Sequence, residues 1–282
     1  MRGNLEAALD LAGRGLAVFP LHYPVERRDG LRCSCGNPDC RDQAKHPFGR
    51  IAHHGLKDAT TDRARVTEWW RRYPRCNVGA RTDRLVVLDV DPRHGGYDSL
   101  AALENAHAAL PDTWTVSTGS NGRHFYFEAP PEVELRNTTG RLGAGLDTRA
   151  AGGYIIAPTS QHISGGYYSW LFAPDEVALA PLPQWLTDVL AKPIARTPEE
   201  RAKAAADWHV LARNGVAVGR RHESLARVTG HLLRRNVDAR VTLELMHAWN
   251  ATRCEPPLEP AEVARIVNDI SLRELMRRGA EK

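Results

Sequence analysis

Two aspartates at the end of an apolar run are the residues whose spacing points most directly to chemistry. Residues 85–90 are nearly all aliphatic, with Asp89 inside the run and Asp91 directly after it. Side chains two positions apart on a strand point to the same face of a sheet, so the two carboxylates should project side by side. Neighbouring carboxylates repel each other unless a cation lies between them. Mg²⁺ or Mn²⁺, which prefer oxygen ligands, would suit this pair.

Two other interpretations of this pair stay open. An Asp-Pro step often begins a turn after a strand, which would account for Asp91 but not for Asp89 inside the apolar run. An Asp-x-Asp pair also occurs in metal-dependent glycosyltransferases. The pair therefore predicts a metal site without identifying the substrate.

A second candidate site is a polar turn followed by an aromatic strand. Residues 119–122 read Gly-Ser-Asn-Gly, and His124 follows at the start of a strand on which His124 and Tyr126 would share a face. Backbone N–H groups of such a turn can approach phosphate oxygens, and a neighbouring histidine can donate to them. The alternative is an ordinary hairpin turn with a histidine at the edge of a strand.

A third candidate site lies between two stretches of small residues. Residues 143–145 and 150–153 enclose Asp147 and Arg149, just before an expected strand. A third carboxylate would complete a two-metal site, and the arginine could meet a phosphate. A surface Asp–Arg pair in a flexible loop would have the same sequence, so this pattern leaves the role open.

Three of the five cysteines lie within eight residues. Together with a histidine they form a Cys-x-Cys-x4-Cys-x5-His pattern, made of Cys33, Cys35, Cys40 and His46. Three thiolates and an imidazole are a donor set for tetrahedral zinc, and without an export signal a metal is favoured over disulfides. The zinc would be structural and would hold the surrounding insertion in place. Other residues that compete as ligands are His53, His54 and Cys76.

These residues must be positioned by a core of strands and helices that precedes a helical tail. Periodicity and turn residues predict helices at 4–14, 61–72 and 99–109 and strands at 17–20, 85–90, 113–117, 124–128 and 154–157. Residues 24–57, which hold the cysteines, lack periodicity and are expected to form a long loop or insertion. A linker is expected at 192–198, followed by three or four amphipathic helices. The expected domains are residues 1–195 and 196–282.

Composition is that of an ordinary soluble globular protein, with 42% hydrophobic and 26% charged residues. No apolar run approaches the roughly 20 residues that a membrane-spanning helix needs, so we expect a cytoplasmic protein with no membrane partner. The net charge is +4; residues 1–195 carry 22 basic and 22 acidic side chains, and residues 196–282 carry 16 and 12. This basic tail fits either a nucleic-acid face or a solvated helical surface.

In this order, the motifs resemble the bifunctional primase-polymerase domain of the archaeo-eukaryotic primase superfamily, over about residues 5–190. Residues 45–47, 69–70, 76–81 and 152–160 look like that family as well. The resemblance implies an α+β fold: a primase-polymerase core with an RRM-like antiparallel or mixed sheet, packed helices and a zinc-binding insertion at about 24–57. The family often has glutamate at Asp91 and a second glycine at Asn121. Aspartate can still bind a metal, and asparagine readily adopts positive φ.

The resemblance also implies roles for the candidate residues. Two catalytic Mg²⁺ or Mn²⁺ ions would be bound by Asp89, Asp91 and Asp147, and the incoming nucleotide would be contacted by His124. Further nucleotide contacts would come from Lys45, Ser120, Gly122, Arg123 and Arg149. Members of the family often carry a zinc-binding loop, which supports the ligand set Cys33, Cys35, Cys40 and His46.

The tail resembles the primase C-terminal helical domain, through residues 220–225, 248–250, 255–258 and 262–267. That domain is associated with primase activity and with binding of the template or the initiating nucleotide. A simpler interpretation is a small bundle, since apolar residues recur at helical spacing at Leu225, Val228, Leu232 and Leu233. Both interpretations can hold at once.

The expected function is a template-dependent DNA primase/polymerase that makes and extends primers from dNTPs or NTPs on single-stranded DNA by two-metal phosphoryl transfer. The sequence has no Gly-x4-Gly-Lys-Ser/Thr loop, so a separate helicase or replisome component is the expected partner. Three alternatives remain: a catalytically weak replication initiator or single-stranded DNA-binding module, a metal-dependent glycosyltransferase, and a polymerase for repair or gap filling.

Overall fold

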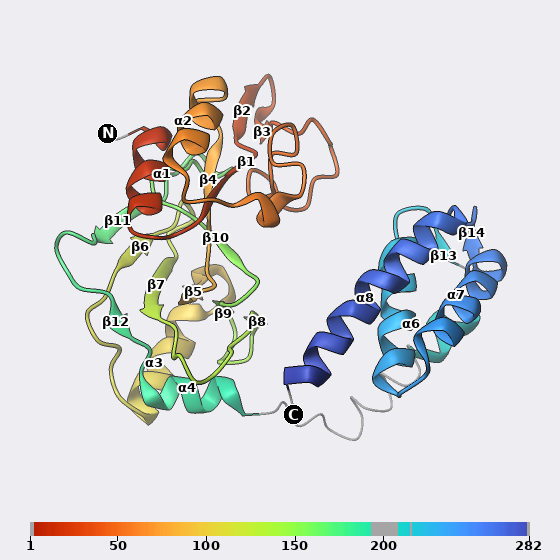
Figure 1. The fold of residues 1–282 in the computed structure, drawn as a ribbon. Helices are drawn as coiled ribbons and strands as arrows, with labels where there is room; N and C mark the ends of the chain where they lie inside the picture. The colour runs from red at the N-terminus through yellow and green to blue at the C-terminus, as the bar shows by residue number, and fades with distance from the viewer. Residues whose placement is uncertain (1–2, 193–207, 215, 281–282) are drawn as a thin grey trace. The chain divides into compact units, whose positions relative to one another are not determined.

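The computed structural model of the chain describes residues 3–192, 208–214 and 216–280 (Figure 1). The chain forms two compact units, residues 1–193 and residues 194–282. The expected domain boundary near residue 195 lies outside the described residues, and so does the expected linker at 192–198 apart from Lys192. Among the helices that the structure describes, none combines the length and apolar character that crossing a membrane requires.

The first unit contains two main sheets and the helices that cover them. Its helices are α1 (Asn4–Gly13), α2 (Arg63–Arg72), α3 (Gly96–Ala106) and α4 (Gln184–Ala191), with the short 3-10 helices η1 (Gly55–Asp58) and η2 (Pro92–His94). Its strands are β1 (Val18–Leu21), β2 (Pro24–Arg27), β3 (Gly30–Cys33), β4 (Asn77–Arg81), β5 (Leu85–Val90), β6 (Thr115–Ser117), β7 (Arg123–Glu128), β8 (Thr138–Thr139), β9 (Leu146–Arg149), β10 (Tyr154–Ile156), β11 (Ser169–Phe172) and β12 (Ala180–Pro181). This mixture of helices and largely antiparallel strands confirms the expected α+β fold.

The larger sheet has the strand order β11-β6-β7-β5-β9-β8, and β12 pairs with β7. Its strand β5 is antiparallel to both β7 and β9. Alternate side chains of β5 enter two different cores, with Val87 on one side and Val86 and Leu88 on the other. Because both faces of β5 are buried, the strand reads as a continuous apolar run.

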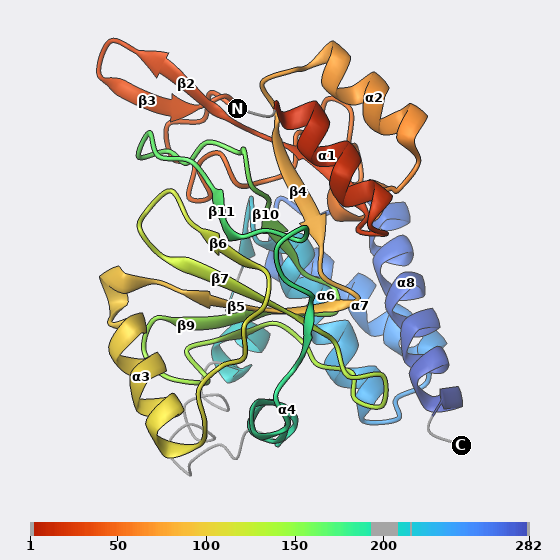
Figure 2. The same cartoon turned by 90° about the vertical axis from the view of Figure 1, so that its left-hand side faces the viewer.

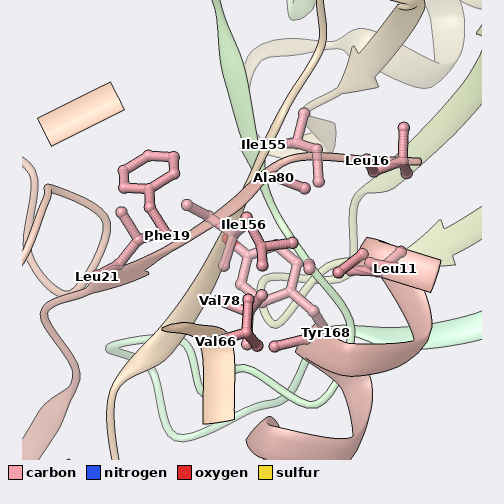
Figure 3. Packing of buried hydrophobic residues seen from close by; sticks show 14 of the residues in the cluster. Leu11, Leu16, Phe19, Leu21, Val66, Val78, Ala80, Ile155, Ile156 and Tyr168 are labelled. Carbon is pink, nitrogen blue, oxygen red and sulfur yellow. The ribbon is translucent and has the colours of Figure 1, made fainter. Parts of the chain in front are cut away.

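Different elements pack on the two faces of the larger sheet (Figure 2). Helices α3 and α4 cover one face, where Leu100 and Leu186 pack in the same core as Leu88. The other face shares a core with a three-stranded antiparallel sheet of order β1-β4-β10, on which α1 and α2 pack. Figure 3 shows this second core, in which Leu11 of α1 and Val66 of α2 lie close to the small sheet.

Two strands of the first unit have little signature in the sequence. Strand β4 contains Asn, Gly and Arg, which favour strands weakly, yet Val78 and Ala80 are fully buried at the centre of the small sheet. The sequence pattern predicts no strand at Asp147 and Arg149 and leaves open a surface pair in a flexible loop. The loop interpretation is wrong, because both residues lie within β9, which pairs with β5 on one side and β8 on the other.

The insertion at residues 24–57 also differs from the long loop that its sequence predicts. It begins with a β-hairpin of β2 and β3, whose turn ends at Gly30 with φ 110°, a conformation that glycine adopts without steric cost. The chain then returns to the small sheet. The N–H of His22 donates to the His46 carbonyl (2.9 Å), and the N–H of Phe48 donates to the Pro20 carbonyl (2.9 Å). Backbone hydrogen bonds to β1 and its end therefore anchor the insertion.

The second unit is built from helices around a small core. Its elements include α6 (Arg221–Arg234), α7 (Ala239–Arg253), α8 (Pro260–Ala280) and the paired two-residue strands β13 (Val216–Ala217) and β14 (Cys254–Glu255), and residues 208–213 are helical as well. Leu225, Val228 and Leu233 are buried, which confirms that the apolar stripe is core. The buried Asn250 side chain both donates to and accepts from the backbone of Leu258, and so fixes the loop before α8.

We predict that Gly79, at the centre of β4, does not tolerate even an alanine. A Cβ there would lie 2.8 Å from Cε1 of Phe19, closer than non-bonded carbon atoms approach. Gly79→Ala should lower the free energy of unfolding by roughly 1–3 kcal/mol, measured by urea denaturation. Gly49→Ala is the matched control, because nothing lies within 4 Å of its Cβ position. Equal stability of the two variants would contradict this packing.

Candidate functional site

Three strands of the larger sheet carry candidate residues in one row. The register of β5 with β7 places Asp89 opposite His124, and its register with β9 places Asp89 opposite Asp147. Side chains directly opposite each other on neighbouring antiparallel strands share a face and lie close together. The row therefore lies on the face where Val87 packs, the face that shares its core with the small sheet.

Asp89 is paired with His124, whose Nε2 lies 3.5 Å from Oδ1 of the carboxylate. Burial acts to raise the pKa of Asp89, but the hydrogen bond and charge of His124, with the charges of Arg149 and Lys45, outweigh it and lower the pKa. The carboxylate is therefore ionised at neutral pH. Nδ1 of His124 is buried and has no hydrogen-bond partner among the described residues. Buried polar atoms are normally paired, so the unpaired Nδ1 is an exception within this core.

Asp91 lies just beyond β5 and caps the short helix η2. Its Oδ1 accepts from the backbone N–H of Arg93 (3.0 Å), and its Oδ2 pairs with Nη2 of Arg93 (2.8 Å) and Nδ1 of His94 (3.0 Å). The Arg93 hydrogen bonds lower the pKa of Asp91 well below its ordinary value. Asp91 thus begins the turn that the Asp-Pro step predicts, and its carboxylate is also held ionised near the end of β5.

Asp147 is bonded on both oxygens. Its Oδ2 pairs with Nη2 of Arg149 (3.2 Å), and its Oδ1 accepts from the N–H of Gly140 (3.1 Å). The three aspartates thus come from one region of the sheet, but their oxygens do not converge. Among the described residues, the only group of three or more metal-binding donors within 4.8 Å of one another is the cysteine–histidine cluster.

Two glycines enclose the backbone of Asp91. The N–H of Asp91 donates to the Gly145 carbonyl (2.8 Å), and the N–H of Gly96 donates to the Asp91 carbonyl (3.0 Å). A Cβ would lie 2.6 Å from the Asp91 carbonyl oxygen if placed on Gly145, and 2.7 Å from it if placed on Gly96. The segments that lead into β9 and α3 therefore meet the end of β5 backbone to backbone, at a distance that only glycine permits.

The turn before His124 is tightly bonded within itself. Asn121 has φ 65°, the left-handed conformation expected for it. The N–H of Asn121 donates to the Thr118 carbonyl (3.1 Å), and the N–H of Gly122 donates to Oγ1 of Thr118 (2.9 Å). These two amides are therefore not free for phosphate, contrary to the expectation for a Gly-Ser-rich turn. The exposed Arg123 lies with its guanidinium carbon 5.7 Å from the Tyr97 ring centroid.

A cavity of about 380 Å³ lies beside the row. The predicted site residues that line it are Lys45, Asp89, His124 and Arg149, whereas Asp91, Ser120, Gly122, Arg123 and Asp147 do not. Burial lowers the pKa of Lys45, and the charges of Asp89 and Asp91 oppose this effect. Two cationic side chains around an ionised carboxylate can bind a phosphate-bearing ligand together with a divalent ion.

Several residues of this cavity escaped the sequence analysis as site residues. Tyr168 is almost fully buried, with its ring centroid 5.8 Å from that of His124. Tyr154 donates its hydroxyl to the Lys45 carbonyl (3.0 Å). Asn137 and Asp42 complete the polar wall. Asp42 carries a signal in retrospect, because it lies between the third cysteine and the histidine of the metal-ligand pattern.

The cysteine–histidine cluster forms as predicted. The donor atoms of Cys33, Cys35, Cys40 and His46 all lie within 4.8 Å of one another, and Nε2 of His46 is 3.4 Å from Sγ of Cys33. Burial and the neighbouring sulfurs raise the pKa of Cys40 to about 12. Three thiolates would therefore not coexist here without a cation, and this donor set is one that zinc prefers.

The competing ligands lie elsewhere. His54 is bonded to Asp58, with Nδ1 3.2 Å from Oδ1, and His53 is exposed outside the cluster. Cys76 is fully buried in the core, and burial raises the pKa of its thiol to about 12. The fourth donor of the cluster is therefore His46.

Comparison with protein families agrees with this geometry. The family model for the bifunctional DNA primase/polymerase N-terminal domain matches residues 8–185, the part of the chain that contains the row, the cavity and the cluster. The model for the primase C terminal 1 domain matches residues 210–275 of the helical unit. No curated protein matches the chain. The order of the two matches confirms the expected architecture, and the chain belongs to the bifunctional DNA primase/polymerase family.

Proposed function

We propose that this chain is a template-dependent DNA primase/polymerase that starts and extends chains on single-stranded DNA from dNTPs or NTPs. The observation that carries the proposal is the row of His124, Asp89 and Asp147 on three paired strands, beside a cavity with two cationic side chains. Family membership supports it. Phosphoryl transfer depends mainly on positioning and charge neutralisation, which such a row and cavity can provide.

Asp89, Asp91 and Asp147 are the proposed ligands of two Mg²⁺ or Mn²⁺ ions. Asp89 and Asp147 lie directly opposite each other, and like charges in that arrangement repel unless positive charge lies between them. Their oxygen donors suit these hard ions. When bound, the ions would lower the pKa of the attacking 3′-hydroxyl and neutralise charge on the leaving pyrophosphate. Arg149 pairs with Asp147 and also lines the cavity, so it connects the carboxylates with the nucleotide site.

The nucleotide is proposed to bind with its phosphates in the cavity. Lys45 and Arg149 would neutralise the phosphates, and the His124 ring, which also lines the cavity, would contact one of them. The remaining predicted contacts precede His124 in the chain and lie outside the cavity lining; they are Ser120, Gly122 and Arg123. We assign the side chains of Ser120 and Arg123 to the part of the nucleotide or primer that extends beyond the cavity. Gly122, whose N–H and carbonyl are both bonded to Thr118, would only shape the turn.

The template and the other partners follow from charge and family. The helical unit, where the basic excess of the sequence lies, is proposed to contact the template backbone, with an affinity that falls as salt rises. A separate helicase or replisome component would unwind the duplex. We place the protein in the cytoplasm, where its cysteines stay reduced and can bind a metal.

A catalytically weak single-stranded DNA-binding module is the second candidate, favoured by one observation. Each of the three carboxylates is paired with a cationic side chain or a histidine, and their oxygens do not converge. A metal-dependent glycosyltransferase would leave both family matches unexplained. Repair or gap filling would use the same site on a different template.

Replacing both strand-end acids should abolish synthesis. Asp89→Ala combined with Asp91→Ala removes two of the three proposed ligands, so incorporation of labelled nucleotides on single-stranded DNA should fall by at least about 100-fold. Asp98→Ala, an exposed acid on α3, is the matched control and should retain activity. Undiminished synthesis by the double variant, or incorporation without a template, would contradict the mechanism.

Asp147 can be tested through ion binding alone. Asp147→Asn keeps the shape of the side chain but removes its charge, so Mn²⁺ binding followed by electron paramagnetic resonance should weaken by at least roughly tenfold. Asp98→Asn serves as the control. Unchanged Mn²⁺ affinity would exclude Asp147 as a ligand, whatever the effect on synthesis.

The purified protein should contain about one equivalent of zinc. His46→Ala removes a donor of the cluster and should lower the bound zinc, whereas His53→Ala should leave it unchanged because His53 lies outside the cluster. Elemental analysis of the folded variants measures both. Well-folded native protein that contains no zinc would refute this ligand set.

A further inference from the structure

The segment between the third and fourth cluster ligands reaches the nucleotide cavity. Asp42 and Lys45 line the cavity, and they are flanked by Cys40 and His46, whose donor atoms belong to the cluster. The N–H of Lys45 donates to the Asp42 carbonyl (3.0 Å), so the two residues form one turn. The segment 40–46 therefore contributes residues both to the cysteine–histidine cluster and to the cavity.

Ala44, in the middle of this segment, has a backbone conformation that its surroundings must enforce. Its φ is 61°, in the left-handed region that an alanine seldom adopts, and its side chain is buried. Its N–H donates to Sγ of Cys33 (3.3 Å), and its carbonyl accepts from Nδ2 of Asn77 (3.0 Å). One of these two bonds is to a cluster sulfur. Such strained backbone persists only where neighbouring structure over-determines it.

The other side of the segment is fixed by the small sheet. The Lys45 carbonyl accepts from the Tyr154 hydroxyl, and the His46 carbonyl accepts from the N–H of His22. The His46 ring packs on the His22 ring, with centroids 4.3 Å apart. The backbone of Lys45 and His46 is therefore held both by the small sheet and by the cluster.

The backbone of residues 40–46 positions the Lys45 ammonium. Its side chain extends into the cavity near Asp89 and Asp91, whose charges act on it, and among the described residues it forms no hydrogen bond or ion pair. A half-buried ammonium whose N–H groups have no hydrogen-bond acceptor in the described part of the chain suits the oxygens of a phosphate. Its placement depends on a backbone whose conformation is set partly by the cluster.

We propose that the Cys₃His cluster, acting through residues 40–46, positions the Lys45 ammonium in the nucleotide cavity, so that metal at the cluster and a nucleoside triphosphate in the cavity stabilise each other's binding. This inference rests on the proposed function. The cluster then does more than stabilise the insertion, because it orders one wall of the nucleotide site. Coupling of this kind is reciprocal: the factor by which metal strengthens nucleotide binding equals the factor by which nucleotide strengthens metal binding.

A double-mutant cycle on the full chain tests this coupling. The probe is a fluorescent deoxynucleoside triphosphate with Mg²⁺, and its binding is measured by anisotropy without catalysis. Cys40→Ser and Lys45→Met should each weaken binding roughly tenfold, and the double variant should bind no more weakly than Lys45→Met alone. His53→Ala, in the same insertion but outside the cluster, should bind as the native chain does.

Other results overturn the inference in distinguishable ways. If Cys40→Ser loses its zinc but keeps native affinity, or if the two losses multiply in the double variant, the cluster does not act through Lys45. If the native chain binds no nucleoside triphosphate, the proposed function itself fails, and the coupling fails with it.

A second measurement needs no cluster variant and stays informative if Cys40→Ser fails to fold. Transfer of zinc from the native chain to a coloured chelator is followed with and without saturating Mg²⁺–nucleoside triphosphate. The nucleotide should lower the rate or the extent of zinc transfer roughly tenfold in the native chain and should have no effect in Lys45→Met. Equal zinc loss with and without nucleotide in a native chain that binds the nucleotide would overturn the proposal.

Discussion

Backbone hydrogen bonds hold β5 in antiparallel register with both β7 and β9, and this pairing decides which side chains meet. Asp89 stands opposite His124 on one neighbour and opposite Asp147 on the other. Because side chains alternate between faces with a period of two, a shift of either strand by one residue would turn its functional side chain toward α3 and α4. The apolar residues of β5 keep the register, since the same shift would also exchange residues between two differently shaped cores.

The groups that stabilise the ionised form of Asp89 come from more than one layer of the first unit. The ionised Asp89 is partly buried, and the positive or hydrogen-bonding groups that lower its pKa come from three different parts of the chain, at His124, Arg149 and Lys45. His124 and Arg149 lie on β7 and β9, which belong to the larger sheet. Lys45 lies in the cysteine-containing insertion, which is bonded to the small sheet. The charge balance of the site therefore depends on how well the two sheets and the insertion stay together.

Much of the first unit could be predicted from its sequence wherever a short segment had a strong structural preference of its own. The apolar run of β5, the left-handed Asn121 and the spacing of Cys33, Cys35, Cys40 and His46 each express a local physical preference, and each is confirmed. Strands β4 and β9 could not be predicted locally, because their residues favour strands only weakly and are held by pairing with distant segments. The same holds for Tyr168, which reaches the cavity through packing that no short pattern encodes. The position of Asp147 opposite Asp89 likewise follows from strand pairing between distant segments and from no local pattern.

The backbone-to-backbone contact of Gly96 and Gly145 with Asp91 restricts the length of the loop that precedes β9. Loops usually vary freely in length among relatives, but the loop that leads into β9 is closed at both ends: Gly140 bonds to Asp147, and Gly145 bonds to Asp91. Adding or removing one residue between them would move Asp147 to the opposite face of β9 or break its contact with β5. Length in this loop is therefore as restricted as sequence is in the core, and variation among relatives should concentrate in other loops of the fold.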